Sequence, residues 1–180
     1  MSYTVNRSYA SHYTINDWEN WKDKWELIDG VPYAMSPAPS PYHQRVNDNI
    51  LAELRRVLKS CKQCRQYMPI DWVIDDDTIV EPDVLVVCKE IKGKHLDFAP
   101  ELIFEILSPS TAEKDREVKS VLYFEQKVKY YVIVDAKKLT AEIFVWNKTG
   151  YAKTIAVQNS KFTFQLSHCL INFNFKNIWD

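Results

Sequence analysis

Several features that would assign this chain to a class are missing from its 180 residues. No apolar run approaches the roughly 20 residues of a transmembrane helix, and residues 1–14 lack the apolar core of a signal peptide. We therefore expect a cytoplasmic protein. The formal net charge is -1, so any surface that binds nucleic acid must be local. The length predicts one domain, residues 1–180, with a substantial core.

Cysteine is scarce, and its spacing argues against a metal site. Cys61 and Cys64 form one Cys-x-x-Cys pair, but no second pair follows at the spacing of a zinc site. Cys88 lies in an apolar stretch and Cys169 lies near the C-terminus. We expect four reduced thiols, with a metal or redox site as the alternative.

Apolar periodicity predicts a mixture of helices and strands. Helical spacing covers 42–60, and a charged helical pattern covers 111–126. Buried-strand patterns cover 79–87, 102–107 and 130–135. An Asp-Gly turn near the N-terminus and alternating segments after 135 predict hairpins at both ends. We therefore expect an α/β fold in which a central mixed sheet is flanked by helices.

Glu105 stands out because the segment 102–107 around it is apolar on both faces of an extended strand. Such a run is typical of a central strand covered on both sides. An ionised carboxylate buried there without a partner costs about several kcal/mol, so it must shift its pKa, meet a cation or bind a metal. A pair with a core arginine such as Arg116 is the ordinary alternative.

A second strand pattern carries Glu81 and Asp83, which alternation places on one face. Carboxylates of Asp83 and Glu105 on neighbouring strands suit Mg²⁺ or Mn²⁺, which can bind a phosphate oxygen and lower the pKa of an attacking water. Lys119 on the following helix would stabilise the charge on the phosphate. The ordinary alternatives are an Asp115–Lys119 helix salt bridge and a turn-capping Asp83.

The helix expected over 42–60 ends in a basic stretch, formed by Arg55, Arg56, Lys59, Lys62 and Arg65. Favourable interaction with the helix dipole on a solvated face is the simpler explanation. Contact with the phosphates of a nucleic acid is the functional one.

Seven motifs occur along the chain in a fixed order. They are Glu26-Leu-Ile-Asp-Gly, His43 opening a helix, Glu81-Pro-Asp83-Val, Glu105-Ile-Leu-Ser-Pro-Ser-Thr, Asp115-x-x-x-Lys119, Tyr123, and Tyr-Tyr-Val-Ile-Val-Asp135. In this combination they resemble the Uma2 (DUF820) family of the PD-(D/E)XK nuclease superfamily. The likeness runs from about Trp25 to Asp135 and is looser in the C-terminal hairpins.

The resemblance implies a restriction-endonuclease-like fold and a metal-dependent endonuclease. Asp83 and Glu105 would be the superfamily's two acids and would bind Mg²⁺ or Mn²⁺. The superfamily's lysine normally lies two residues after the second acid, where this chain has Leu107. Lys119 is the candidate for a relocated lysine.

Glu26 and His43 match family positions that would assist metal or substrate binding. Glu26 could equally pair with a cation at a hairpin, and His43 could simply begin a helix. The resemblance also implies DNA as the substrate and a homodimer, because two strands need two sites. The alternatives are a catalytically inactive DNA-binding or regulatory module and a hydrolase of another phosphate ester.

Overall fold

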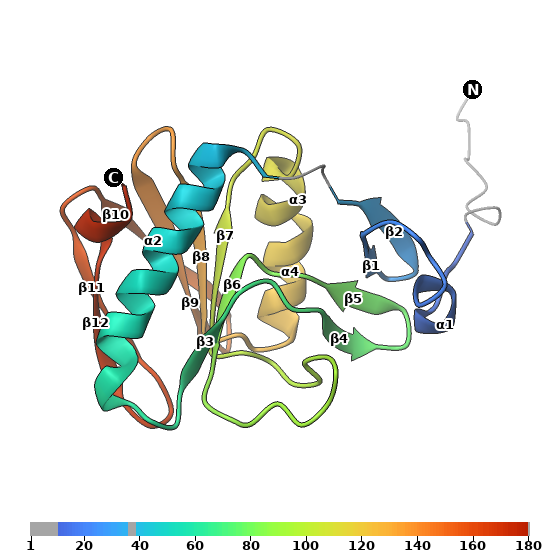
Figure 1. The fold of residues 1–180 in the computed structure, drawn as a ribbon, viewed down its shortest axis with the longest axis horizontal. Coiled ribbons are helices and arrows are strands. Elements are labelled where there is room, and N and C mark those ends of the chain that lie inside the picture. The colour runs from blue at the N-terminus through green and yellow to red at the C-terminus, as the bar shows by residue number, and fades with distance from the viewer. Residues whose placement is uncertain (1–10, 36–38, 180) are drawn as a thin grey trace.

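A six-stranded sheet forms the centre of the computed structural model, which describes residues 11–35 and 39–179 (Figure 1). The strand order is β10-β9-β8-β7-β6-β3; β7 and β8 run parallel, and the other neighbours run antiparallel. The strands are β3 (Arg65–Tyr67), β6 (Val84–Val87), β7 (Leu102–Ile106), β8 (Tyr130–Asp135), β9 (Thr140–Asn147) and β10 (Gly150–Val157). The predicted α/β fold with a central mixed sheet is confirmed.

β7 lies in the middle of this sheet, and all five of its residues are buried. Phe104 and Ile106 belong to the core on one face, whereas Ile103 belongs to the core on the other. Because side chains alternate along a strand, Glu105 points to the same face as Ile103. The apolar run around Glu105 therefore reflects cover on both faces.

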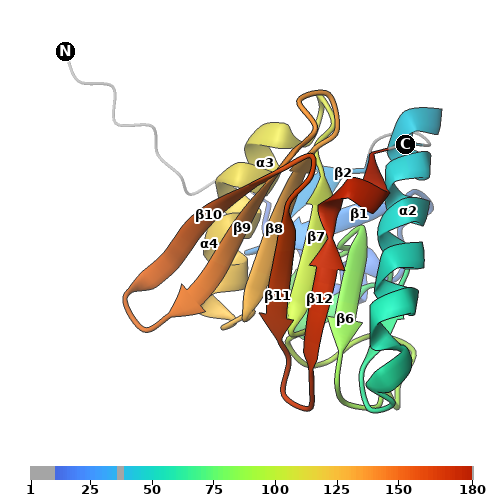
Figure 2. The same cartoon turned by 90° about the vertical axis from the view of Figure 1, so that its left-hand side faces the viewer.

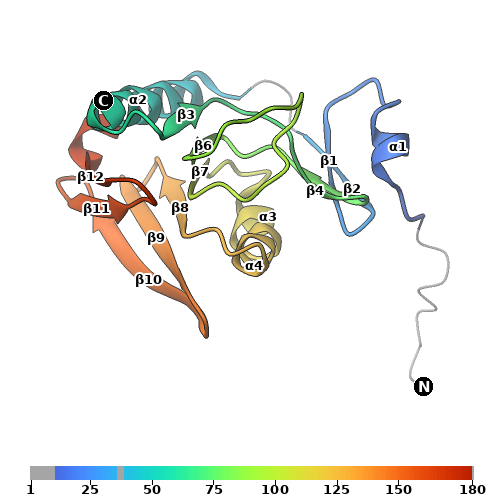
Figure 3. The same cartoon turned by 90° about the horizontal axis from the view of Figure 1, so that it is seen from below.

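Helices cover both faces of the sheet. The helix α2 (Pro41–Val57) packs on one face together with the hairpin β11 (Lys161–Gln165) and β12 (Leu170–Asn174), as Figure 2 shows. The opposite face carries α3 (Ala112–Arg116) and α4 (Val118–Glu125) (Figure 3). None of the helices in the described residues is long and apolar enough to cross a membrane.

Local sequence explains where α2 begins and which side it buries. Pro41 occupies the first turn, and the Ser40 hydroxyl accepts a hydrogen bond from the backbone N–H of His43 at 3.2 Å. The buried positions follow the helical period, with Val46, Ile50 and Leu54 fully covered. A 3₁₀ turn, η2 (Leu58–Ser60), continues the helix to the end that we predicted.

The second helical prediction, over 111–126, needs a correction. The segment forms two helices, α3 and α4, with Glu117 between them.

The last helical element of the described residues is another 3₁₀ turn, η3 (Phe175–Ile178), which lies beside α2 (Figure 2).

A second sheet of order β2-β1-β5-β4 adjoins the first (Figures 1 and 3). Its strands are β1 (Trp25–Ile28), β2 (Val31–Ala34), β4 (Trp72–Asp75) and β5 (Thr78–Val80), and the short helix α1 (Ile15–Trp18) precedes them. Asp29 and Gly30 join β1 to β2 with positive φ angles of 50° and 72°, the backbone of a tight hairpin turn. The N-terminal hairpin is confirmed.

The expectation of four reduced thiols is wrong in this structure. Cys61 is bonded to Cys169, and Cys64 is bonded to Cys88. The bonded partners are 108 and 24 residues apart in the sequence. Tertiary approach of distant segments determines the pairing, and local spacing gives no indication of it.

Candidate active site

Four carboxylates that lie far apart in the sequence converge where β7 ends. We call Glu26, Asp83, Glu105 and Asp115 the acidic cluster; they come from β1, the residue before β6, β7 and α3. Glu26, Glu105 and Asp115 are buried, with relative exposures of only 1%, 3% and 2%. Buried carboxylates need compensating cations or hydrogen bonds, so their partners determine what this site can do.

Lys119 provides the central positive charge. Its ammonium lies 2.7 Å from Glu26 Oε1 and 2.8 Å from Glu105 Oε1. Asp115 Oδ1 lies further away, at 3.8 Å. The Tyr123 hydroxyl also donates a hydrogen bond to Glu105 Oε1 at 2.9 Å. Glu105 Oε1 is therefore held by two donors from α4.

Glu26 is the best compensated member of the cluster. Lys114 forms an ion pair with its Oε2, and the backbone N–H of Glu81 donates to its Oε1 at 2.9 Å. Burial alone would raise the pKa of Glu26, but Lys119 and Lys114 bring it below its ordinary value. Glu26 is therefore ionised and fixes both ammonium groups.

Sheet register brings Asp83 next to Glu105. Val84 pairs with Phe104 across the antiparallel β6–β7 ladder, so Asp83, the residue before β6, stands opposite Glu105. The backbone N–H of Ile106 donates to Asp83 Oδ2 at 2.8 Å. His43 Nε2 lies 3.3 Å from the same oxygen. Asp83 is thus oriented by the end of β7 and by the first turn of α2.

The acidic cluster is electrostatically coupled. Burial raises the pKa of Glu105 well above its ordinary value; Lys119 opposes this shift, while Asp115 and Asp83 add to it. Burial likewise raises the pKa of Asp115, again opposed by Lys119. Burial alone would lower the pKa of Lys119, but Glu105 and Glu26 hold it well above its ordinary value. Lys119 therefore remains an ammonium, whereas Glu105 lacks sufficient positive charge around it.

The charge balance of the site fits a divalent cation. When all four carboxylates are ionised and His43 is neutral, the two ammonium groups of Lys114 and Lys119 leave a formal charge of -2. Asp115 Oδ1 is buried without a hydrogen-bond partner. Oxygen donors of this kind are the ligands of Mg²⁺ and Mn²⁺. In the described part of the chain, the acidic cluster offers no three ligand atoms within 4.8 Å of one another, so water or substrate would complete the coordination of an ion.

The structure brings together all five residues singled out from the sequence: Glu26, His43, Asp83, Glu105 and Lys119. Other expectations need correction. Glu81 does not share a strand face with Asp83, because both lie outside β5 and β6, and its side chain pairs with Lys24 at 3.2 Å.

The arginine alternative for Glu105 is also wrong. Arg116 pairs with Glu142 instead. Lys114 also belongs to the site, but the sequence did not predict it. No local pattern connects Lys114 with Glu26, which lies 88 positions away.

The basic end of α2 lies away from the acidic cluster. His43 is in the first turn of α2, and the 17 residues of the helix span about 25 Å. Arg56, in the last turn, donates to Glu53 at 2.8 Å. Favourable charge at a helix C-terminus and this local pair account for part of the basic stretch.

Comparison with family models gives a match over residues 11–174 to Uma2, described as "Putative restriction endonuclease". Among solved structures, the chain is similar to a crystal structure of a "putative nuclease belonging to DUF820" from Anabaena variabilis ATCC 29413. The TM-score is 0.74 at 15% sequence identity, covering 93% of this chain and 97% of that chain. At this identity the likeness establishes a shared fold. The comparison with curated proteins gave no match.

Proposed function

The chain belongs to the Uma2 family, and from this premise we propose that it is an endonuclease that hydrolyses DNA phosphodiester bonds with a divalent cation. The observation that carries the proposal is the position of Lys119. The superfamily pattern has a lysine where this chain has Leu107, and an ammonium from α4 stands beside the second acid instead. An acid pair and a charged lysine are thus present together.

Asp83 and Glu105 are the proposed ligands of Mg²⁺ or Mn²⁺. They lie side by side, with the N–H of Asp83 3.4 Å from Glu105 Oε2. When bound, the cation would supply a Lewis acid that lowers the pKa of an attacking water and neutralises charge on the phosphate. The surplus of negative charge in the acidic cluster supports this assignment.

The remaining residues act by position and charge. Lys119 stays protonated and would stabilise the negative charge that develops on the phosphate. Glu26 holds Lys119 in place through its Oε1. His43 holds the carboxylate of Asp83. DNA is the proposed partner, and two copies of the chain would cut the two strands of a duplex.

Plasmid cleavage tests the proposal. Supercoiled and single-stranded DNA would be incubated with Mg²⁺ or Mn²⁺ and with wild type, Asp83→Asn or Asp77→Asn. Asp77 is a matched control because its side chain is 31% exposed, against 23% for Asp83, and it pairs with His12 outside the acidic cluster. We expect cleavage by wild type and Asp77→Asn and a loss of about 10²-fold or more for Asp83→Asn.

Other outcomes would assign a different activity. Cleavage that survives Asp83→Asn would reject this site. Hydrolysis of a small chromogenic phosphodiester without cleavage of DNA would assign another phosphate ester. Light scattering of the purified protein with and without duplex DNA would test the homodimer.

A second candidate function rests on burial. Glu105 and Lys119 are each only 3% exposed, and of the five residues predicted from the sequence only Asp83 and His43 reach the surface in part. A catalytically inactive module that binds DNA through the nuclease fold fits this covered arrangement. Calorimetry separates the two functions: the inactive module would bind DNA without binding Mg²⁺ or Mn²⁺, whereas the enzyme would bind both.

A further inference from the structure

All four cysteines of the chain meet at the C-terminal end of α2. Cys61 follows η2, Cys64 precedes β3, Cys88 follows β6, and Cys169 lies between β11 and β12. The segments that carry them are far apart in the sequence. This sulfur cluster lies at the opposite end of α2 from His43, and Cys88 lies at the other end of β6 from Asp83 of the acidic cluster.

The sulfur atoms are close enough to share one ion. The ligand atoms of Cys61, Cys64 and Cys169 all lie within 4.8 Å of one another. Cys88 is bonded to Cys64 but lies outside this group, so its sulfur is more than 4.8 Å from that of Cys61 or Cys169. Four sulfurs around one Zn²⁺ lie about 3.8 Å apart, given Zn–S bonds of about 2.3 Å in a tetrahedron. Three of the sulfurs are thus already grouped, and Cys88, once released from Cys64, would have to turn toward them to complete the tetrahedron.

The backbone geometry is unusual for one of the two disulfides. The Cα atoms of Cys64 and Cys88 are 3.9 Å apart, below the range of about 4.4–6.8 Å usual for a disulfide, whereas those of Cys61 and Cys169 are 5.9 Å apart, within that range. The backbone N–H of Cys64 donates to the carbonyl of Cys61 at 3.1 Å, which closes a turn within the Cys-x-x-Cys sequence. This spacing presents two thiolates to one ion in zinc ribbons and related sites.

We propose that, in the reduced protein, Cys61, Cys64, Cys88 and Cys169 bind one Zn²⁺ as a structural site. Reduction of the two disulfides by a dithiol or phosphine takes up four electrons and four protons. Binding of Zn²⁺ then releases the four thiol protons. Four protein ligands leave no open position on the ion, so the site would fasten segments together without activating water.

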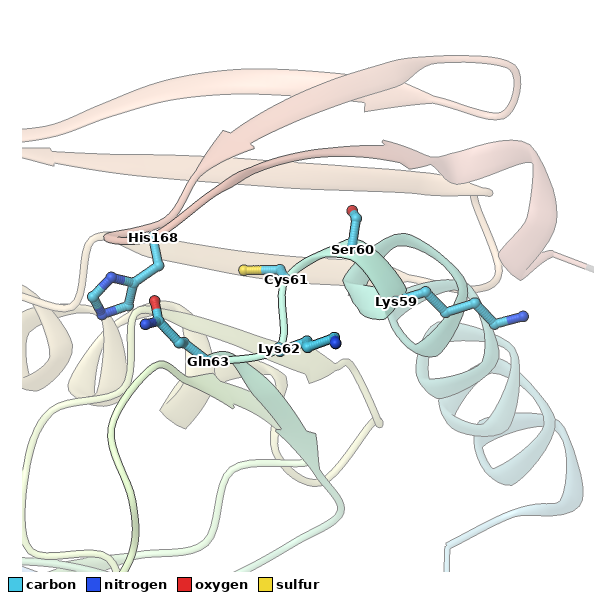
Figure 4. A pocket seen from close by; sticks show the side chains of 6 residues that line it. All are labelled: Lys59, Ser60, Cys61, Lys62, Gln63 and His168. Atoms are coloured by element: carbon cyan, nitrogen blue, oxygen red, sulfur yellow. The ribbon is translucent and has the colours of Figure 1, made fainter.

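The site would connect three parts of the fold. These are the segment between α2 and β3, the end of β6, and the turn between β11 and β12. A shallow pocket of about 330 Å³ adjoins Cys61, and Figure 4 shows the sulfur of Cys61 pointing toward the side on which His168 lies. His168 lines the same pocket and is also a zinc-binding residue type, but unlike Cys88 it is not bonded to any of the three neighbouring cysteines. It provides a matched control.

Metal analysis of the reduced wild-type protein tests the proposal. Protein purified with a phosphine reductant should contain one zinc per chain and should release four titratable thiols when it is denatured with a chelator. Replacement of zinc by Co²⁺ should give the charge-transfer and visible bands of a tetrahedral tetrathiolate. Reduced protein that takes up no zinc in competition with a chromogenic chelator would overturn the proposal.

Variants test the ligand assignment. Cys88→Ser and Cys169→Ser should lower the zinc content or affinity by about tenfold or more, whereas His168→Ala should retain one zinc per chain. Loss of zinc in His168→Ala with retention in Cys88→Ser would reject the four-cysteine assignment. The result does not depend on nuclease activity, because the wild-type metal content is read without DNA.

Discussion

Lys119 and Glu105 form a buried ion pair in which Nζ lies 2.8 Å from Oε1 and each side chain is only 4% exposed. Fourteen positions separate the two residues, and they come from α4 and β7. Lys119 also contacts Glu26 at 2.7 Å. A single ammonium therefore compensates two buried carboxylates, so its removal should affect stability as well as any activity.

Lys119→Met should lower the free energy of unfolding by about 3–5 kcal/mol, because Glu105 and Glu26 would lose a buried partner. Urea unfolding at neutral pH would measure the change. The double variant Lys119→Met/Glu105→Gln should recover part of the loss, since one uncompensated charge is then removed. No recovery in the double variant would contradict the coupling of this pair.

Lys114→Met is the matched control for Lys119. Lys114 pairs with Glu26 but has no contact with Glu105 in the described interactions. We expect a smaller loss of stability than for Lys119→Met and DNA cleavage closer to that of wild type. Equal loss of cleavage in the two variants would reject a special role for Lys119.

Binding of Mg²⁺ or Mn²⁺ should strengthen as the pH rises. Burial raises the pKa of Glu105 well above its ordinary value, so a proton competes with a cation for this carboxylate up to a higher pH than at an ordinary glutamate. Titration calorimetry across a pH series should show affinity that rises through this pKa and then levels off. An affinity independent of pH would show that Glu105 is not a ligand.

His43 should make stability depend on pH. Burial alone would lower its pKa, but the hydrogen bond and charge of Asp83 raise it above the ordinary value of 6.5. A raised pKa means that this pair stabilises the fold fully below about pH 6.5 and that the contribution is lost as the pH rises through the folded-state pKa. Melting temperatures measured over this range should show the decline.

Two variants isolate that contribution. His43→Gln should flatten the decline of melting temperature with pH, and Asp83→Asn should flatten it similarly because it removes the main partner. A decline that is unchanged in both variants would assign it to other groups.

The parts of the site that the sequence predicts are those that depend on how strands are buried and paired. The apolar run around Glu105 specifies a strand covered on both faces, and burial of its carboxylate then demands a cation. Asp83 could be placed beside Glu105 because consecutive buried strands are commonly neighbours. Lys119 could be proposed because its helix follows the Glu105 strand, but its spacing also fits a helix salt bridge with Asp115, and the family resemblance favours the site.

The parts that the sequence does not predict depend on tertiary approach. Lys114 reaches Glu26 only because α3 packs beside the end of β1. Cys88 and Cys169 reach the Cys-x-x-Cys turn only because β6 and the β11–β12 hairpin end beside it. No sequence periodicity in these segments indicates that they come into contact. The lone Cys-x-x-Cys therefore led to the wrong expectation of four reduced thiols.

Glu53 joins α2 to the C-terminal segment and should be a determinant of acid stability. Its carboxylate accepts hydrogen bonds from the backbone N–H of Asn174 at 2.9 Å and from the Asn177 amide at 2.8 Å. Burial alone would raise the pKa of Glu53, but the hydrogen bonds from Arg56 and Asn177 bring it below its ordinary value. The stability that it contributes is therefore present above about pH 4.5 and lost as the pH falls through the lowered pKa.

Glu53→Gln should lower the free energy of unfolding by about 1–3 kcal/mol at neutral pH, because charge-assisted hydrogen bonds become neutral ones and one buried donor loses its acceptor. The difference from wild type, followed by urea unfolding, should shrink in acid as wild-type Glu53 takes up its proton. Arg56→Gln is the control: its side chain is 57% exposed, so the loss should stay below about 1 kcal/mol. If Arg56→Gln were as destabilising as Glu53→Gln, the exposed ion pair would carry the effect, and the link to Asn174 and Asn177 would contribute nothing measurable.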